Sequence, residues 1–208
     1  MNLKKKREIN SKTKYLCAFL VIALFLSVCY FFLSSPSDAD IADTWSNSGF
    51  LSVGQHLTVQ NTDSSMSLLD SKDVLSADGL YYAAWTMGDS RPYENSEGET
   101  VDLYDAQLYL LLSDSKNSDD ARMDMSKWLN AAKNNYDILT EEEISCNGLT
   151  YQLITYHCSG KDNPYDRGIS AFCSWENTAM CAELTCLKEF DTDLRGILIH
   201  FLDSCSYE

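Results

Sequence analysis

The first hydrophobic pattern in the chain is an unbroken apolar run near its N-terminus. Residues 15–33, YLCAFLVIALFLSVCYFFL, contain no charged side chain. As a helix this run is about 28 Å long, which matches the hydrocarbon core of a bilayer. The pattern therefore predicts one N-terminal transmembrane helix across residues 15–33.

The charges ahead of this run predict its orientation. Residues 1–14 hold six basic residues and a single acidic residue, Glu8, and basic flanks stay on the cytoplasmic side of a membrane. We therefore expect residues 1–14 to form a cytoplasmic tail of a single-pass cell-membrane protein whose C-terminal domain is extracytoplasmic. A cleaved signal peptide or lipoprotein signal is the competing interpretation. The length of the run and the lack of a clear cleavage site favour the uncleaved anchor.

The pattern changes after the apolar run. Residues 34–49 are rich in Ser and Asp and have no sustained apolar period, which predicts a linker. From residue 50 onward, short apolar and aromatic segments alternate with polar segments, which is typical of strands and loops. The sequence predicts strands at Leu57–Gln60, Leu80–Met87 and Thr100–Ser113, the last either continuous or broken around Asp105, with a loop at Gly88–Glu99.

Two segments have helical periodicity. The first begins near Ser118, a good N-cap, followed by Asp119 and Asp120 where the helix dipole favours negative charge. The second is the C-terminal segment, which Asp191 or Thr192 is expected to cap. The two apolar stripes consist of Ala121, Met125, Trp128, Leu129 and Ala132 in the first helix, and of Leu194, Ile197, Leu198, Phe201, Leu202 and Cys205 in the second.

Four β-prone segments lie between these helices. Asn147-Gly148 between apolar runs is a strong hairpin signal, and Glu176-Asn177 is expected to form a second two-residue hairpin loop. Residues 159–168 form a turn-rich loop between the two hairpins. The order of strands, helix, four strands and helix predicts an α+β fold for residues 50–208, with an antiparallel sheet flanked by helices.

The segment from Phe50 to the C-terminus resembles the PsbP-like fold, which includes DcrB-type extracytoplasmic proteins. The resemblance rests on the helix ending KNNYD, the following ILTEEEISCNGLTYQLITY with Tyr151, Leu153 and Tyr156, and the closing helix with Phe201-Leu202. It implies a non-enzymatic module that binds or assembles partners. It transfers no site residue, because the metal and cofactor positions of individual family members have no counterpart that aligns with this sequence.

Strand parity predicts where the cysteines of the second hairpin point. If Glu176-Asn177 is the loop, Cys173 lies opposite Met180, and Cys173 and Cys186 share the core face of the sheet. Cys181 then faces away from that core. The periodicity of the last helix places Cys205 on its apolar face, so a pairing of Cys186 with Cys205 is the preferred disulfide.

The cysteines outside the apolar run have three interpretations. A zinc site would need converging ligands and a Cys-x2–4-Cys pair, which the sequence lacks. An even number of cysteines in an extracytoplasmic compartment favours disulfides over free buried thiols, and six cysteines allow 15 pairings. The disulfide candidates are Cys146, Cys158, Cys173, Cys181, Cys186 and Cys205.

No catalytic set is recognisable in the sequence. His56, His157 and His200 are the only histidines, and each has a structural explanation in a loop, a strand or a helix. His157 and Cys158 are adjacent on a strand and so point to opposite faces. The acidic run Glu141-Glu142-Glu143 and the pair Asp191 and Asp193 lack the ligand number of a calcium loop. We therefore predict no enzymatic activity, no cofactor and no metal.

Charge limits the partners of the chain. The whole chain carries −15 and residues 1–35 carry +5, so the remainder carries −20. Such a surface repels nucleic acids. The sequence predicts a membrane-anchored, non-catalytic module that binds or assembles a protein partner. The alternative is a hydrolase at the cell surface that uses paired carboxylates, which would require a pocket with two close, desolvated acids.

Overall fold

The computed structural model describes residues 49–60, 62–72, 79–95, 98–158 and 163–207. The predicted tail (1–14), the predicted anchor (15–33) and nearly all of the predicted linker (34–49) lie outside these residues. Neither of the two described helices is long and apolar enough to span a membrane. The described elements, in chain order, are β1 (Phe50–Val53), β2 (Leu57–Gln60), β3 (Met66–Lys72), β4 (Leu80–Glu94), β5 (Thr100–Asp114), α3 (Ser118–Asn135), β6 (Asp137–Cys146), β7 (Leu149–His157), β8 (Arg167–Trp175), β9 (Thr178–Cys186), α4 (Leu194–Asp203) and β10 (Cys205–Tyr207).

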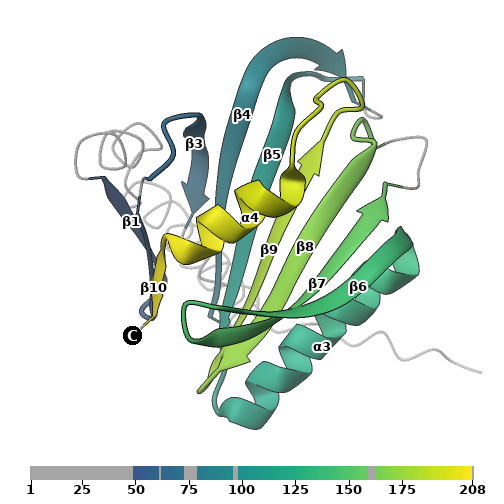
Figure 1. Ribbon diagram of the computed structural model, residues 1–208. Coiled ribbons are helices and arrows are strands. Elements are labelled where there is room, and N and C mark those ends of the chain that lie inside the picture. Colours follow the sequence, from purple (N-terminus) through teal and green to yellow (C-terminus); the bar gives the residue numbers. More distant parts are fainter. Residues whose placement is uncertain (1–48, 61, 73–78, 96–97, 159–162, 208) are drawn as a thin grey trace, which may run out of the picture. The chain divides into compact units, whose positions relative to one another are not determined.

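The strands form two antiparallel sheets. The large sheet has seven strands in the order β3-β4-β5-β9-β8-β7-β6, and the small sheet has the order β1-β2-β10. Helix α4 crosses one face of the large sheet, and α3 lies on the opposite face (Figure 1). The predicted α+β class, an antiparallel sheet flanked by helices, is therefore confirmed for the described residues.

The main core lies on the face of the large sheet that α4 covers. Alternate residues of the central strands, such as Leu108 and Leu110 of β5 and Leu184 of β9, are fully buried there. The apolar stripe of α4 packs onto them through Leu198 and Phe201. The small sheet adds further buried side chains to this core. Side chains alternate along a strand, which places Leu108, Leu110 and Leu184 on the same face of the large sheet.

Helix α3 covers part of the other face. Its Leu129 packs against Ile154, Tyr156 and Phe172, which are fully buried on β7 and β8. The N-cap of α3 is Asn117 and not Ser118 as predicted. The Asn117 side chain accepts hydrogen bonds from backbone N–H groups of the first turn, which is the usual role of an N-cap residue. The predicted amphipathic stripe of α3 is confirmed, because its members are buried or packed on this second core.

The predicted hairpins are present with the expected register. Asn147 and Gly148 both have positive φ, 50° and 82°, as the two central residues of a tight hairpin require. In the second hairpin Trp175 lies opposite Thr178 and Cys173 lies opposite Met180. The strand register assumed in predicting the orientation of the cysteines in this hairpin is therefore the observed one.

Three expectations about element bounds were wrong. Strand β4 runs through Gly88 to Glu94, which the composition had predicted as a loop. Helix α4 ends at Asp203 and is capped by Asp193, and Cys205 begins the short strand β10 instead of lying on the helix. Strands β1 and β3 were not predicted from the sequence at all.

Candidate functional site

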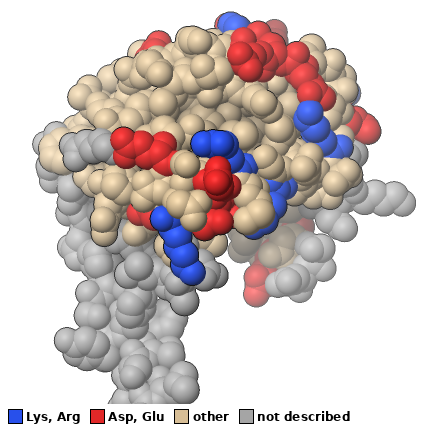
Figure 2. Space-filling model, turned by 90° about the horizontal axis from the view of Figure 1, so that it is seen from below, with Lys and Arg blue, Asp and Glu red and all other residues tan. Residues whose placement is uncertain are grey.

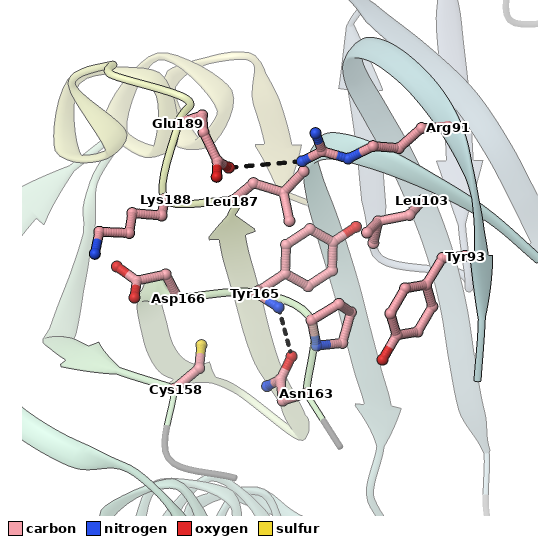
Figure 3. A pocket seen from close by; sticks show the side chains of 11 residues that line it. Arg91, Tyr93, Leu103, Cys158, Asn163, Tyr165, Asp166, Leu187, Lys188 and Glu189 are labelled. Carbon is pink, nitrogen blue, oxygen red and sulfur yellow. Dashed lines mark hydrogen bonds and ion pairs between the residues drawn. The ribbon is translucent and has the colours of Figure 1, made fainter. Parts of the chain in front are cut away.

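A pocket of about 460 Å³ lies beside the end of the sheet where β4 and β5 extend past the core. Three segments supply its walls: the paired arms of β4 and β5, the connection from β7 to β8, and the connection from β9 to α4 (Figure 3). Its volume is within the range of small-molecule sites. The convergence of segments that are far apart in sequence makes this the candidate ligand site.

The floor of the pocket is apolar. Leu103, Tyr165 and Leu187 are 8%, 8% and 4% exposed and form a separate buried cluster, against which Tyr93 and Cys158 are packed. Figure 3 shows the Tyr165 ring in the middle of the site, between Leu187 and Leu103. Since this floor is already buried, an apolar group of a ligand would find contacts there without a large rearrangement.

Backbone hydrogen bonds fix the segments that carry these side chains. The N–H of Leu187 donates to the carbonyl oxygen of Asp105 (2.9 Å), and the N–H of Asp166 donates to that of Cys186 (3.0 Å). The side chain of Asn163 accepts from the N–H of Tyr165 (3.0 Å), which closes a local Asx turn. The floor is thus held by the sheet and by one turn.

The hydroxyl of Tyr165 is buried without a hydrogen-bond partner among the described residues. Burial raises the pKa of Tyr165 well above its usual value, Tyr109 adds to this increase, and the backbone of Tyr104 offsets only part of it. A buried hydroxyl that lacks a partner costs free energy, about 1–3 kcal/mol. The hydroxyl of Tyr165 therefore stays protonated and is a buried donor that lacks an acceptor among the described residues.

Charged side chains surround the opening. Arg91 and Glu189 form a long ion pair, with 3.6 Å between Nη2 and Oε2, and their side chains are 50% and 76% exposed. Lys188 and Asp166 also line the pocket, and no ion pair in the described part of the chain includes Lys188. Exposed ion pairs contribute little free energy. The guanidinium of Arg91 can therefore turn to a bound anion at small cost. Lys188 extends away from Arg91 (Figure 3), and its exposed side chain would have to turn inward to reach the same anion.

The one thiol in the pocket is not suited to nucleophilic chemistry. Burial, together with the nearby carboxylates of Glu183 and Asp166, raises the pKa of Cys158 to about 12. The thiolate is the reactive form of cysteine, and only a very small fraction of Cys158 is ionised at neutral pH. The chemistry available in this pocket is binding by an apolar floor, one buried hydroxyl and two cations.

The acidic run that was weighed as a calcium site lies elsewhere. Glu141 and Glu142 on β6 are bound to basic side chains, Lys133 of α3 (2.5 Å) and Arg195 of α4 (2.8 Å). Glu141, Glu142 and Lys133 border a second concavity of about 390 Å³ beside α3. Asp193 caps α4 through the N–H of Gly196 (3.1 Å). No group of metal-ligating side chains occurs among the residues that the structure describes.

Charges of both signs are mixed on the surface as well. Seen from below, groups of Asp and Glu alternate with Lys and Arg over the described part of the molecule (Figure 2). Among the described residues, ion pairs also join β6 to α3 and to α4. On the face drawn in Figure 2, acidic side chains are therefore interspersed with basic ones.

The six outer cysteines are all free thiols in this structure. Cys173 and Cys186 belong to the main core, and Cys181 packs on the opposite side of the sheet, as strand parity predicted. Cys205 also reaches the main core, although from β10 and not from the helix. Whether any of these cysteines forms a disulfide in the cell stays a prediction.

The preferred pairing of Cys186 with Cys205 does not fit the structure. The Cys186 thiol lies near the carbonyl oxygen of Phe190 (3.9 Å), ahead of α4, whereas the Cys205 thiol donates to that of Phe201 (3.4 Å) at the other end of this helix. The ten residues of α4 span about 15 Å. A disulfide needs Cα atoms within about 7 Å. The sequence argument placed both thiols on the correct face but could not place them along it.

The three histidines are not brought together. His56 lies between β1 and β2, His157 ends β7, and His200 lies on the exposed side of α4, where its Nε2 is 3.3 Å from the Thr62 hydroxyl. None of them lines the pocket. The sequence analysis missed the pocket residues themselves, because Arg91 and Tyr93 lie in a segment predicted as a loop and no local motif marks Tyr165 or Leu187.

The chain was compared with protein families, curated proteins and solved structures. No family model matches it, and no curated protein matches it. Among solved structures it is similar to the solution structure of cyanobacterial PsbP (CyanoP) from Synechocystis sp. PCC 6803, with 11% sequence identity and a TM-score of 0.36. The similarity covers 67% of this chain and 99% of that chain. The resemblance stated from the sequence names the same family, and no residue role follows from this similarity.

Proposed function

We propose that residues 50–208 are a non-catalytic, extracytoplasmic binding module, tethered to the cell membrane by residues 15–33, and that the pocket of Figure 3 is its ligand site. The observation that carries this proposal is the combination within one pocket of a buried apolar floor, an unpartnered Tyr165 hydroxyl and two cations, Arg91 and Lys188. Binding sites generally combine apolar walls with a few converging polar groups.

The chemistry of the pocket indicates an amphipathic ligand with one carboxylate. Its apolar part would lie on Leu103 and Leu187, and its carboxylate would accept hydrogen bonds from Arg91 and Lys188, which are strong when both partners are charged. A ligand with several negative charges is disfavoured by the net charge of −20 in residues 36–208. The free carboxyl end of a partner polypeptide with an apolar last residue has this chemistry, which agrees with the protein partner expected from the sequence.

The hydrolase alternative is less well supported by the same pocket. It does contain two acids, Asp166 and Glu189. Glu189, however, is 76% exposed and paired with Arg91, whereas a general acid needs an apolar environment that keeps its carboxyl protonated. Burial keeps the thiol of Cys158 protonated, so the pocket also lacks an activated nucleophile. Binding without chemistry is the simpler use of these residues.

The ligand class can be tested with matched probes. The full chain in nanodiscs of zwitterionic lipid would be titrated with N-acetyl-phenylalanine and N-acetyl-leucine as free acids and as amides, monitored by NMR or calorimetry. We expect the acids to bind at least about tenfold more tightly than the amides, because a charge-assisted hydrogen bond contributes about 1.5–3 kcal/mol. The double variant Arg91→Ala and Lys188→Ala should abolish this preference.

A matched control is Arg122→Ala, which removes an exposed, ion-paired arginine on α3 and should leave binding unchanged. Equal affinity for acids and amides, or an acid preference that persists in the double variant, would contradict the proposed site. Turnover of amide or ester analogues that is lost in Glu189→Gln would favour the hydrolase instead.

The anchor and its orientation give a separate prediction. Protease added to intact cells should remove the domain of residues 50–208, and an epitope placed before Lys4 should stay protected, because the basic flank holds the N-terminus in the cytoplasm. Immunoblots with and without permeabilisation measure both ends. A domain that is digested only after permeabilisation would show that the orientation is reversed or that the domain is intracellular.

A further inference from the structure

Three buried thiols lie on the α4 face of the large sheet near the last strand. Cys146 ends β6, Cys173 lies on β8, and Cys205 begins β10; their residues are 7%, 1% and 1% exposed and belong to the same core. None of them lines the candidate ligand site. A disulfide between two of these thiols would therefore be separate from the function of the pocket.

Two hydrogen bonds attach the tip of the β6–β7 hairpin to the junction of α4 and β10. The thiol of Cys146 donates to Oδ1 of Asp203 (2.9 Å), and the side-chain amide of the next residue, Asn147, donates to the backbone carbonyl of Cys205. The Cys205 thiol is turned beneath the end of α4, toward the carbonyl of Phe201. Two consecutive residues of the hairpin, Cys146 and Asn147, thus contact Asp203 and Cys205.

Cys173 competes with Cys146 for Cys205 but is less well placed. It lies deeper in the core, next to Tyr151 on β7, whose hydroxyl is hydrogen-bonded to that of Tyr207. Burial is the main cause that raises the pKa of Cys173 and of Cys205. Cys205 adds to the increase at Cys173, and Cys146 adds to the increase at Cys205, so the three thiols are within electrostatic range. Only Cys146 also has a neighbouring residue that is hydrogen-bonded directly to Cys205.

We propose that Cys146 and Cys205 form a disulfide that ties the C-terminal strand to the β6–β7 hairpin when the domain folds in an oxidising compartment. The bond would replace the hydrogen bond between Cys146 and Asp203. Asp203 is exposed, so its carboxylate can be hydrated instead. The closed loop contains about 60 residues, which is long enough for a large effect on the unfolded chain.

The oxidation requires a disulfide as the electron acceptor, such as oxidised glutathione or a thiol oxidoreductase. One thiolate attacks the acceptor disulfide and releases one thiol, and the second thiolate then displaces the other half, so that two protons and two electrons leave the cysteines. Burial holds the pKa of both Cys146 and Cys205 at about 12 in the folded domain. The bond should therefore form during folding, before these thiols are buried.

The test uses the full chain refolded in mild detergent with a mixture of reduced and oxidised glutathione, and then alkylated with N-ethylmaleimide. Mass spectrometry of non-reduced peptides should show Cys146 joined to Cys205 and Cys173 alkylated. Reduction should lower the melting temperature by about 10 °C, since a loop of this length has a large entropic effect. A linkage of Cys173 to Cys205, or complete alkylation of both Cys146 and Cys205, would overturn the proposal.

Variants separate the bond from the packing of its cysteines. Cys173→Ser and Cys181→Ser should keep the Cys146–Cys205 peptide and the loss of melting temperature on reduction. Cys146→Ser should lose both, while its melting temperature should equal that of the reduced parent within about 3 °C, because a serine at this edge of the core replaces the thiol with little change in volume. A sensitivity to reduction that survives Cys146→Ser would also rule out this pairing.

Discussion

Replacing Phe201 with alanine should lower the free energy of unfolding by about 3–5 kcal/mol, the usual cost of deleting a buried aromatic side chain. Phe201 is 3% exposed in the main core. Its ring meets the fully buried ring of Trp85 edge-on, with 5.1 Å between the centroids and an interplanar angle of 65°. Such aromatic pairs add about 0.5–1.5 kcal/mol beyond their burial, so the loss should fall in the upper part of the range.

Urea denaturation of the full chain measures this change, and Met123→Ala on α3 is the matched control. Met123 is 50% exposed, so its replacement should change the free energy of unfolding by less than about 0.5 kcal/mol. Because domains are typically stable by about 5–15 kcal/mol, Phe201→Ala should leave a marginal fold. A loss below about 1 kcal/mol would mean that α4 is not held against the sheet by this side chain.

Local patterns predicted the parts of this fold that local interactions determine. The stripe of α4 and the Asn147-Gly148 turn were both recognisable, because a helix period and a two-residue hairpin are encoded within a few neighbouring residues. Cys205 continued the helical period but lies beyond it, because the chain leaves α4 at Ser204 to pair with β2. Pairing with a strand that lies some 150 residues earlier leaves no mark on the local pattern.

The arm of β4 and β5 shows why the candidate site was missed. Residues 88–94 are mostly exposed and contain Gly88 and Pro92, which is typical of a loop. They form a strand because β5 pairs with them. The pairing of β3 with β4 ends at Met87, so within the described part of the chain Pro92 lies on an edge without a second partner strand, where proline is tolerated. Arg91 reaches the pocket only because of this extension. No sequence motif records a site that three distant segments assemble.

The face of the sheet under α3 contains a position where only glycine fits. A Cβ at Gly168 would lie 2.6 Å from both Cζ and Oη of Tyr156, closer than such atoms approach in proteins. The Tyr156 ring cannot turn away, because it is stacked on Tyr136 with 4.1 Å between the centroids. Its hydroxyl is also hydrogen-bonded to Ser170 (3.1 Å) and to the carboxylate of Glu183.

Gly168→Ala should therefore lower the free energy of unfolding by about 2–3 kcal/mol, toward the upper end of the cost of inserting a methyl group into a packed core. The change should shrink to less than about 1 kcal/mol when it is measured in a Tyr156→Leu background, since the smaller side chain leaves room for the new Cβ. A double-mutant cycle by urea denaturation gives this coupling free energy.

Gly196→Ala in α4 is the matched control for this cycle. Its Cβ would also approach another atom to 2.6 Å, but that atom is Oδ2 of Asp193, the end of an exposed side chain that can move. Alanine in a helix is favoured over glycine by about 1 kcal/mol, which offsets any loss at the cap. If Gly168→Ala proves as mild as Gly196→Ala, the Tyr156 ring must be free to move. The stack with Tyr136 and the hydrogen bonds to Ser170 and Glu183 would then not fix this face of the sheet.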